Sequence, residues 1–229
     1  APDNGFAFHN WWHLALFYLD RQRHERVLAL YDQHILPEPA EFSLQLVDAT
    51  AMLWRLYLLG IDTGERFQAV ADAWEQKLEV ERGFYAFNDA HAIMAFLGAG
   101  RDRAVRQTLR DLEATAHGTK GRNVMMSREV GLPLSRGFQA FAQGRYLDAV
   151  AHIEPVRDIA HRFGGSHAQR DLITLTLIEA ALRAGQAPLA RHYLAERLVH
   201  KPASALGWRW LARTENAEPA RPWAMRQAA

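Results

Sequence analysis

A glycine turn between two apolar helical runs recurs along the chain and limits the folds that it can adopt. The segments LGAGRDRA, AQGRYLDA and RAGQAPLA all show it, and they span residues 97–104, 142–149 and 183–190. Leu59-Gly60 ends another run in the same way, and we expect the next helix to have its N-cap at Asp62 or Thr63. Each turn ends one helix and starts the next, so the pattern predicts helical hairpins.

The apolar residues between these turns follow a helical period. Near the N-terminus they fall at positions i, i+3, i+4 and i+7, at Trp11, Leu14, Ala15 and Tyr18. This spacing places them on one face of a helix. Pro37 and Pro39 end the second run, because proline does not fit a helix interior. No segment alternates apolar and polar residues over a strand's length, so we predict an all-α chain.

The hairpins match the spacing of tetratricopeptide repeats, which have a period of about 34 residues. We predict a tetratricopeptide-like, right-handed α-solenoid of about five hairpins, at residues 6–40, 42–83, 86–118, 127–163 and 167–201. A capping helix at 203–215 closes the stack, because a hairpin cannot bury both of its apolar faces alone. We therefore expect a single domain over residues 1–215 and a flexible tail over 216–229.

Composition excludes several classes of function. The 229 residues contain 27 basic and 26 acidic side chains, interspersed along the chain, which argues against nucleic-acid binding. No apolar run is long enough to cross a membrane. The chain has no cysteine, so it has neither disulfides nor a thiolate site, and together with the lack of a visible signal peptide this leads us to expect a cytoplasmic protein.

Three histidine-containing segments stand out. In FHNWWHLAL, His9 and His13 are four residues apart and share a helix face, which suits either a metal pair or a polar His13 that faces a pocket between Trp11 and Trp12. Asn10 as N-cap would instead leave His9 outside the helix. In FNDAHAIMAF, Asn88 or Asp89 suits an N-cap. His91 is not explained by capping, and we expect it to be buried with a partner.

The third segment is GGSHAQRDLI, residues 164–173. Ser166 and Gln169 form a capping box, and the glycines end the preceding helix. His167, Arg170 and Asp171 have no such structural role. They lie at i, i+3 and i+4 on one helix face, so we take them as candidate ligand-binding residues.

Two further charged positions and one loop complete the candidates. Asp48 lies inside the apolar run LQLVDATAML and needs a partner or a cavity. Arg128 precedes VGLPLSRG. An internal salt bridge would be a sufficient structural explanation for Asp48 and for Arg128. Residues 116–129 form the only long loop that we predict, which is either a functional loop or a surface insertion.

Five motifs in fixed order, HNWWHLALFYLD, NDAHAIMAF, REVGLPLSRG, GGSHAQRD and KPASALGWRWLA, resemble the tetratricopeptide repeat protein 38 family over residues 6–213. The resemblance implies a helical repeat fold and identifies the chain as the C-terminal half of a longer protein. The motifs place family positions at His13, His91, Arg128, His167, Arg170 and Asp171. Lys201-Pro202 stands where the family has Arg-Pro. The resemblance implies no reaction, because none is established for the family.

Two functions follow from these residues. The first is a binding module whose concave face holds a peptide or small anionic metabolite, with Arg170 and Arg128 clamping a carboxylate and with Trp12 and Asn88 in the lining. The second is an enzyme of hydrolytic or lyase type. In it His13, His91 or His167 would transfer protons, and Asp48 or Asp171 would orient the imidazole. We favour the binding module, with no cofactor or metal, although three histidines and a carboxylate leave a metal-assisted enzyme open. An N-terminal half and self-association both stay open as partners.

Overall fold

The computed structural model describes residues 4–36, 40 and 42–216. All regular elements in these ranges are helical, so the predicted all-α class is confirmed. The first elements are α1 (Ala7–Asp20), α2 (His24–Leu30), the π-helical turn η1 (Tyr31–Ile35), α3 (Ser43–Leu58), α4 (Arg66–Glu81), α5 (Ala86–Gly98) and α6 (Asp102–Ala116). They are followed by α7 (Arg122–Met126), the π-helical turn η2 (Ser127–Gly131), α8 (Leu132–Ala142), α9 (Tyr146–Arg157), the 3₁₀ turn η3 (Ala160–Phe163), α10 (His167–Arg183), α11 (Ala187–His200) and α12 (Ala205–Asn216).

The helices pair as the sequence predicts. Each predicted hairpin contains two packed helices, α1 with α2, α3 with α4, α5 with α6, α8 with α9 and α10 with α11, and α12 packs on α11. Close crossings use glycine: a Cβ on Gly137 of α8 would lie 2.5 Å from Cγ1 of Ile153 on α9. The predicted tail begins where α12 ends, and its residues 217–229 lie outside the described ranges.

One turn geometry ends the first helix of every hairpin. Gly60, Gly100, Gly144 and Gly185 have φ between 70° and 74°, a left-handed conformation that glycine adopts readily. After each one the next amide donates to a carbonyl five residues earlier, as Arg101 N does to Phe96 O at 2.8 Å, which is a Schellman motif. The first hairpin has the same turn with Gln22 at φ 58°, followed by Arg23 N donating to Tyr18 O at 2.9 Å.

Two of the expected N-caps are wrong. Glu65 precedes α4, and the Asp62 carboxylate instead accepts a hydrogen bond from Gly64 N at 2.9 Å within the connecting turn. Tyr85 precedes α5, so Asn88 and Asp89 lie in the first turn of the helix. Neither helix start has a side-chain cap. The backbone just before the helix is bridging at Glu65 and extended at Tyr85, and this change of conformation marks where each helix begins.

The long loop that we expected at residues 116–129 is also wrong, since most of it is helical. The short helix α7 and the turn η2 occupy residues 122–131 and lead directly into α8, with Pro133 in its first turn. Asn123 anchors this segment to the α4–α5 turn. Its side chain donates to Gly83 O at 2.6 Å and accepts from Ala86 N at 2.8 Å, which satisfies backbone groups that a free loop would leave to water.

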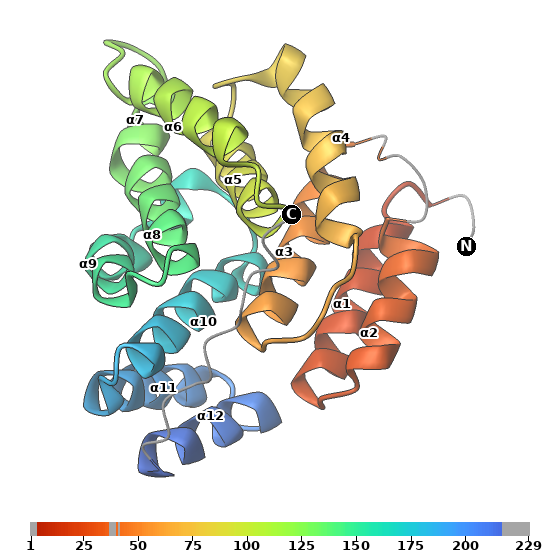
Figure 1. The fold of residues 1–229 in the computed structure, drawn as a ribbon, viewed down its shortest axis with the longest axis vertical. Helices are drawn as coiled ribbons and strands as arrows, with labels where there is room; N and C mark the ends of the chain where they lie inside the picture. The colour runs from red at the N-terminus through yellow and green to blue at the C-terminus, as the bar shows by residue number, and fades with distance from the viewer. Residues whose placement is uncertain (1–3, 37–39, 41, 217–229) are drawn as a thin grey trace.

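The stack of hairpins curls until distant helices touch. Figure 1 shows the chain passing from α1 and α2 around to α8 and α9, and α10 returning to the side of α3. In addition, α12 contacts α1. Trp54 of α3 fills the interior, with its ring 5.4 Å from that of Phe138 on α8 and its Nε1 donating to Thr176 Oγ1 of α10 at 3.1 Å. The first helices of these hairpins therefore meet in the interior, where Trp54 links α3 to α8 and α10.

One enclosed space in the interior is small. A cavity lined by His91, Phe138 and Gln169, between α5, α8 and α10, has a volume of only about 10 Å³. Among the described residues, no helix is both long and apolar enough to traverse a bilayer.

Candidate functional site

A buried carboxylate joins three helices near their N-terminal ends. Asp48 of α3 is fully buried, and its Oδ2 lies 2.6 Å from Nδ1 of His9 on α1. Its Oδ1 accepts a hydrogen bond from Nε2 of Gln169 on α10 at 3.2 Å. Burial raises the pKa of Asp48, and its hydrogen bonds with His9 and Gln169 oppose that rise. Asp48 therefore has the side-chain partners that its place in an apolar run requires.

Aromatic rings fix the orientation of His9. Its imidazole stacks on Trp12 with 5.5 Å between the ring centroids, and it meets His13 edge-on at 4.8 Å. Trp12 is fully buried, whereas His13 is exposed. Burial of part of the ring, together with the neighbouring His9, lowers the pKa of His13. Phe6 and not Asn10 precedes α1, so His9 is inside the helix and the alternative with Asn10 as N-cap is wrong.

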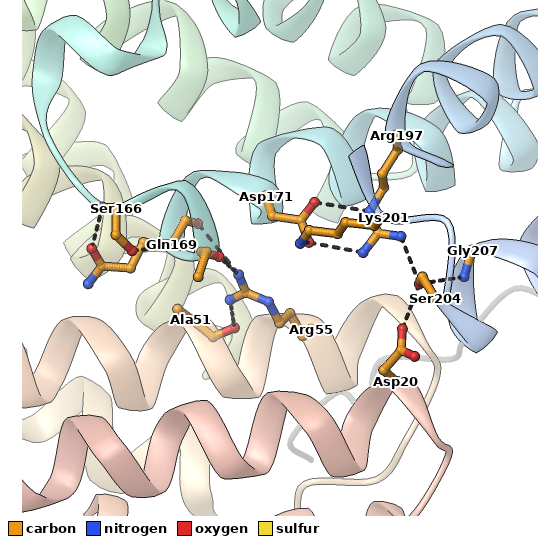
Figure 2. Close-up of polar contacts among 11 residues, drawn as sticks. Asp20, Ala51, Arg55, Ser166, Gln169, Asp171, Arg197, Lys201, Ser204 and Gly207 are labelled. Atoms are coloured by element: carbon orange, nitrogen blue, oxygen red, sulfur yellow. Dashed lines mark hydrogen bonds and ion pairs between the residues drawn. The ribbon is translucent and has the colours of Figure 1, made fainter. Parts of the chain in front are cut away.

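Arg55 carries a buried charge whose hydrogen bonds go to backbone carbonyls. Its guanidinium donates to Ala51 O at 2.9 Å and to Ala168 O at 2.7 Å, which joins α3 to the start of α10 (Figure 2). The side chain is 2% exposed and lies over the ring of Trp12. Burial lowers the pKa of Arg55 to about 10, while the charge of Asp171 opposes this change.

Asp171 forms ion pairs with two cations. Its two carboxylate oxygens accept hydrogen bonds from Nε and Nη2 of Arg197, both at 3.0 Å, and Oδ2 also lies 2.7 Å from Nζ of Lys201 (Figure 2). Burial would raise the pKa of Asp171, but attraction to Arg197 and Lys201 outweighs it and lowers the pKa to about 2. The expectation that Asp171 orients an imidazole is therefore wrong, because two cations occupy its oxygens.

The same cluster continues to the start of α12. Arg197 Nη1 donates to Ser204 Oγ at 3.1 Å, and Ser204 Oγ in turn donates to Asp20 of α1 at 2.6 Å (Figure 2). Asp20 also accepts from Ala205 N at 2.9 Å, and Gly207 N donates to Ser204 Oγ at 3.0 Å. Two first-turn amides of α12 are thus satisfied by one residue of α1 and one hydroxyl.

Two pockets open beside the cluster formed by Asp171, Arg197 and Lys201, here called the Asp171 cluster. The larger, of about 870 Å³, lies between the end of α9, the start of α10 and the end of α11. The smaller, of about 410 Å³, lies between the end of α1 and the α11–α12 turn, with Arg55 at its wall. Asp171, Arg197 and Lys201 line both pockets. The Lys201 side chain is 41% exposed, so its ammonium remains accessible to a ligand.

The structure brings the predicted face of α10 together. His167, Arg170 and Asp171 all line the larger pocket, and Arg170 also borders the small cavity that contains His91. Arg170 donates to the carbonyls of Gly164 and Gly165 through Nη1. The capping box of Ser166 and Gln169 is confirmed, and Gln169 additionally reaches the interior.

The other predicted residues do not join this pocket. His91 is 3% exposed, its Nδ1 lies 2.8 Å from Phe87 O, and its Nε2 has no partner among the described residues. Burial lowers the pKa of His91 to about 4, and nearby Arg55 adds to this effect. Asn88 is half-buried on α5, and Arg128 is exposed on η2, so the expected clamp of Arg170 with Arg128 has no support in the geometry.

In the described part of the chain, no group of three or more histidine or carboxylate side chains is arranged to hold a metal ion. The predicted pair of His9 and His13 is brought together, but Asp48 occupies Nδ1 of His9.

Comparison with known proteins found no family model that matches the chain. It also found no solved structure that matches.

Sequence reasoning did not select three charged residues that the structure places around Asp171. Arg55 interrupts the most apolar run of the chain, LWRLYLLGI, and a lone charge in such a run predicts a buried partner network. Arg197 and Lys201 are four residues apart at the end of a helix, where cations also favour the helix dipole. Basic residues near the end of a helix are common, so the sequence does not mark this pair as part of a site.

Proposed function

We propose that the chain is a tetratricopeptide-like helical repeat protein that binds a small anionic ligand. The ligand carries carboxylate or phosphate groups and occupies the pocket between α9, α10 and α11. One observation carries the proposal: at this pocket Asp171 is the carboxylate partner of both Arg197 and Lys201, so two cations share one carboxylate there. A bound anion would supply the second negative charge.

The lining of the pocket supports an anionic ligand. Its charged residues are four cations and three carboxylates, a net charge of +1 with histidines neutral, at Arg157, Arg170, Arg197, Lys201, Asp158, Asp171 and Glu196. Arg170 uses Nη1 for backbone carbonyls and has no carboxylate partner among the described residues, which leaves its remaining donors for a ligand. A planar guanidinium with a nearby ammonium suits carboxylate or phosphate oxygens.

The shape of the pocket favours a small molecule over a peptide. Its volume of about 870 Å³ falls in the range of small-molecule sites, roughly 300–1,000 Å³. A peptide would need an extended groove, and the interior faces of α3, α8 and α10 are packed together. The proposed ligand site therefore lies near the end of the stack of hairpins and not on its concave face.

The order of five motifs supports membership of the tetratricopeptide repeat protein 38 family, and the repeated Schellman turns support the solenoid. We place the protein in the cytoplasm because it lacks cysteine.

Titration calorimetry with citrate and with inorganic phosphate at low salt tests the proposal. We expect saturable binding that weakens as salt is added, because the attraction is between charges. Lys201→Gln should weaken the affinity about tenfold through loss of one charge-assisted hydrogen bond. Lys120→Gln is the matched control, since Lys120 is exposed beside α7 and should leave binding unchanged.

Three results would contradict the proposal. The first is no heat with either anion. The second is equal weakening by Lys201→Gln and Lys120→Gln, which would indicate nonspecific charge. The third is binding of an acidic peptide with a free C-terminus but of neither small anion, which would favour peptide capture.

A further inference from the structure

His9 has the geometry of an imidazole prepared for proton transfer. Asp48 holds one ring nitrogen, Nδ1, at 2.6 Å, and Gln169 fixes the second oxygen of that carboxylate. The other ring nitrogen, Nε2, is not engaged by Asp48. The His9 side chain is 24% exposed while Asp48 is fully buried, so the exposed part of the ring is the part turned away from the carboxylate.

The arrangement is costly for a purely structural contact. A buried carboxylate loses its hydration, and well-packed apolar residues in its place are often as stable or more stable. Here the carboxylate instead accepts hydrogen bonds from residues 39 and 121 positions away. A carboxylate with a perturbed pKa beside a partly exposed imidazole is typical of acid–base sites.

Other histidines lack this combination. The Nδ1 of His91 lies near a backbone carbonyl and its whole side chain is buried, so no substrate can reach it. His13 and His167 are exposed, and neither has a carboxylate contact in the described part of the chain. His192 is near Glu196 at 3.3 Å, but both side chains are well exposed, at 59% and 44%, so water competes for them.

We propose that His9 is a catalytic general base for the hydrolysis of small carboxylic esters, with Asp48 and Gln169 as its positioning residues. Nε2 of His9 removes a proton from water while the water oxygen bonds to the ester carbonyl carbon. The tetrahedral adduct then breaks its bond to the alkoxy oxygen, which leaves with the electron pair and takes the proton from His9. The products are a carboxylic acid and an alcohol.

Neighbouring side chains suggest which esters fit. Phe6 precedes His9 by three residues, is 60% exposed and stacks near Phe8, with ring centroids 6.5 Å apart. These two rings provide an aromatic surface at the start of α1, within one helical turn of His9, while buried Trp12 supports the imidazole from below. An aryl ester therefore suits the site, and the proposal is independent of anion binding near Asp171.

Hydrolysis of p-nitrophenyl acetate by the intact chain tests the proposal. We expect His9→Ala to lower the rate by about 100-fold, as general-base catalysis contributes at least this much. Added imidazole should restore part of the loss, because it can occupy the vacated space. Asp48→Asn should lower the rate and change its pH profile, because the amide presents an N–H to the ring and disfavours the productive tautomer.

His117→Ala is the control, because His117 is exposed and its Nδ1 contacts only the carbonyl of Glu113. It should keep the wild-type rate. Circular dichroism of each variant separates loss of fold from loss of chemistry. A folded His9→Ala variant with the wild-type rate overturns the proposal, and so does a loss that imidazole does not restore or that His117→Ala reproduces.

Discussion

Gln169 shows how one side chain can have two roles. Its Oε1 accepts from Ser166 N at 2.8 Å and completes the cap of α10, while its Nε2 donates to the buried Asp48. The capping role is readable from the spacing of Ser166 and Gln169. The second role depends on a residue 121 positions away and could not be read. A complete local explanation for a side chain therefore does not exclude a second function.

Burial shifts the pKa values of two side chains on α5 in opposite directions. Burial raises the pKa of Asp89 to about 7, with Gly83 N–H opposing and Asp111 adding to the shift. Burial lowers the pKa of His91 to about 4. Between about pH 4 and 6.5, folded Asp89 holds a proton that the unfolded chain has released, so stability falls as pH rises. Folded His91 lacks a proton that the unfolded chain binds, so stability rises.

The opposite pH dependences of stability from Asp89 and His91 should nearly cancel in the wild-type protein. Each should become visible when the other residue is replaced. Asp89→Asn leaves only the His91 contribution, so the free energy of unfolding should rise with pH by at most about 1.4 kcal/mol per unit. His91→Gln leaves the Asp89 contribution, and the slope should have the opposite sign. Urea unfolding at several pH values measures both. Parallel pH profiles for the two variants would show that neither shift exists.

At the scale of elements, the hairpins share one turn, and only its first copy lacks glycine. The four glycines made these boundaries predictable, because a left-handed residue after a helix is a local signal. Gln22 carries no such signal, since its left-handed φ of 58° follows from the surrounding turn and not from its residue type. The sequence DRQRHE consequently predicted a polar break but not its geometry.

Gln22→Gly should stabilise the protein by about 0.5–1 kcal/mol, because glycine removes the strain of a left-handed side chain. Chemical denaturation gives the change in the free energy of unfolding. The reciprocal variant, Gly144→Gln, should destabilise by a similar amount. A Cβ at Gly144 meets no atom within 4 Å, so only backbone strain is tested. Destabilisation by Gln22→Gly would mean that the Gln22 side chain makes a stabilising contribution of its own.

At the scale of the whole molecule, the curl of the stack decides which residues meet. Helix ends are set largely by neighbours in sequence, and the turn glycines predicted where the first helix of four hairpins ends, although the starts of α4 and α5 and the short helix α7 were missed. The approach of α10 to α3, and of α12 to α1, instead accumulates from small rotations between successive hairpins. These rotations depend on side-chain packing at each crossing. His9 with Asp48, and Arg197 with Asp171, were therefore beyond prediction, although Asp48 and Asp171 themselves were selected as candidates.

Closure between the first and last helices rests on Asp20, which allows a direct test. Its carboxylate accepts from Ser204 Oγ and from Ala205 N, and both contacts hold the start of α12 against α1. Asp20→Asn turns one acceptor into a donor that faces a donor, and it removes a negative charge from the helix start. We expect α12 to open more readily by about 1–2 kcal/mol.

Hydrogen exchange localises that effect. Amides of α12 should exchange faster in Asp20→Asn, whereas those of α5 should keep their wild-type rates, because α5 lies away from the α1–α12 contact. Asp102→Asn is the matched control, since Asp102 is an exposed acid in the first turn of α6 and changes the charge equally. Faster exchange throughout the molecule would indicate that α12 does not open as a separate unit and that the closing contact stabilises the whole stack.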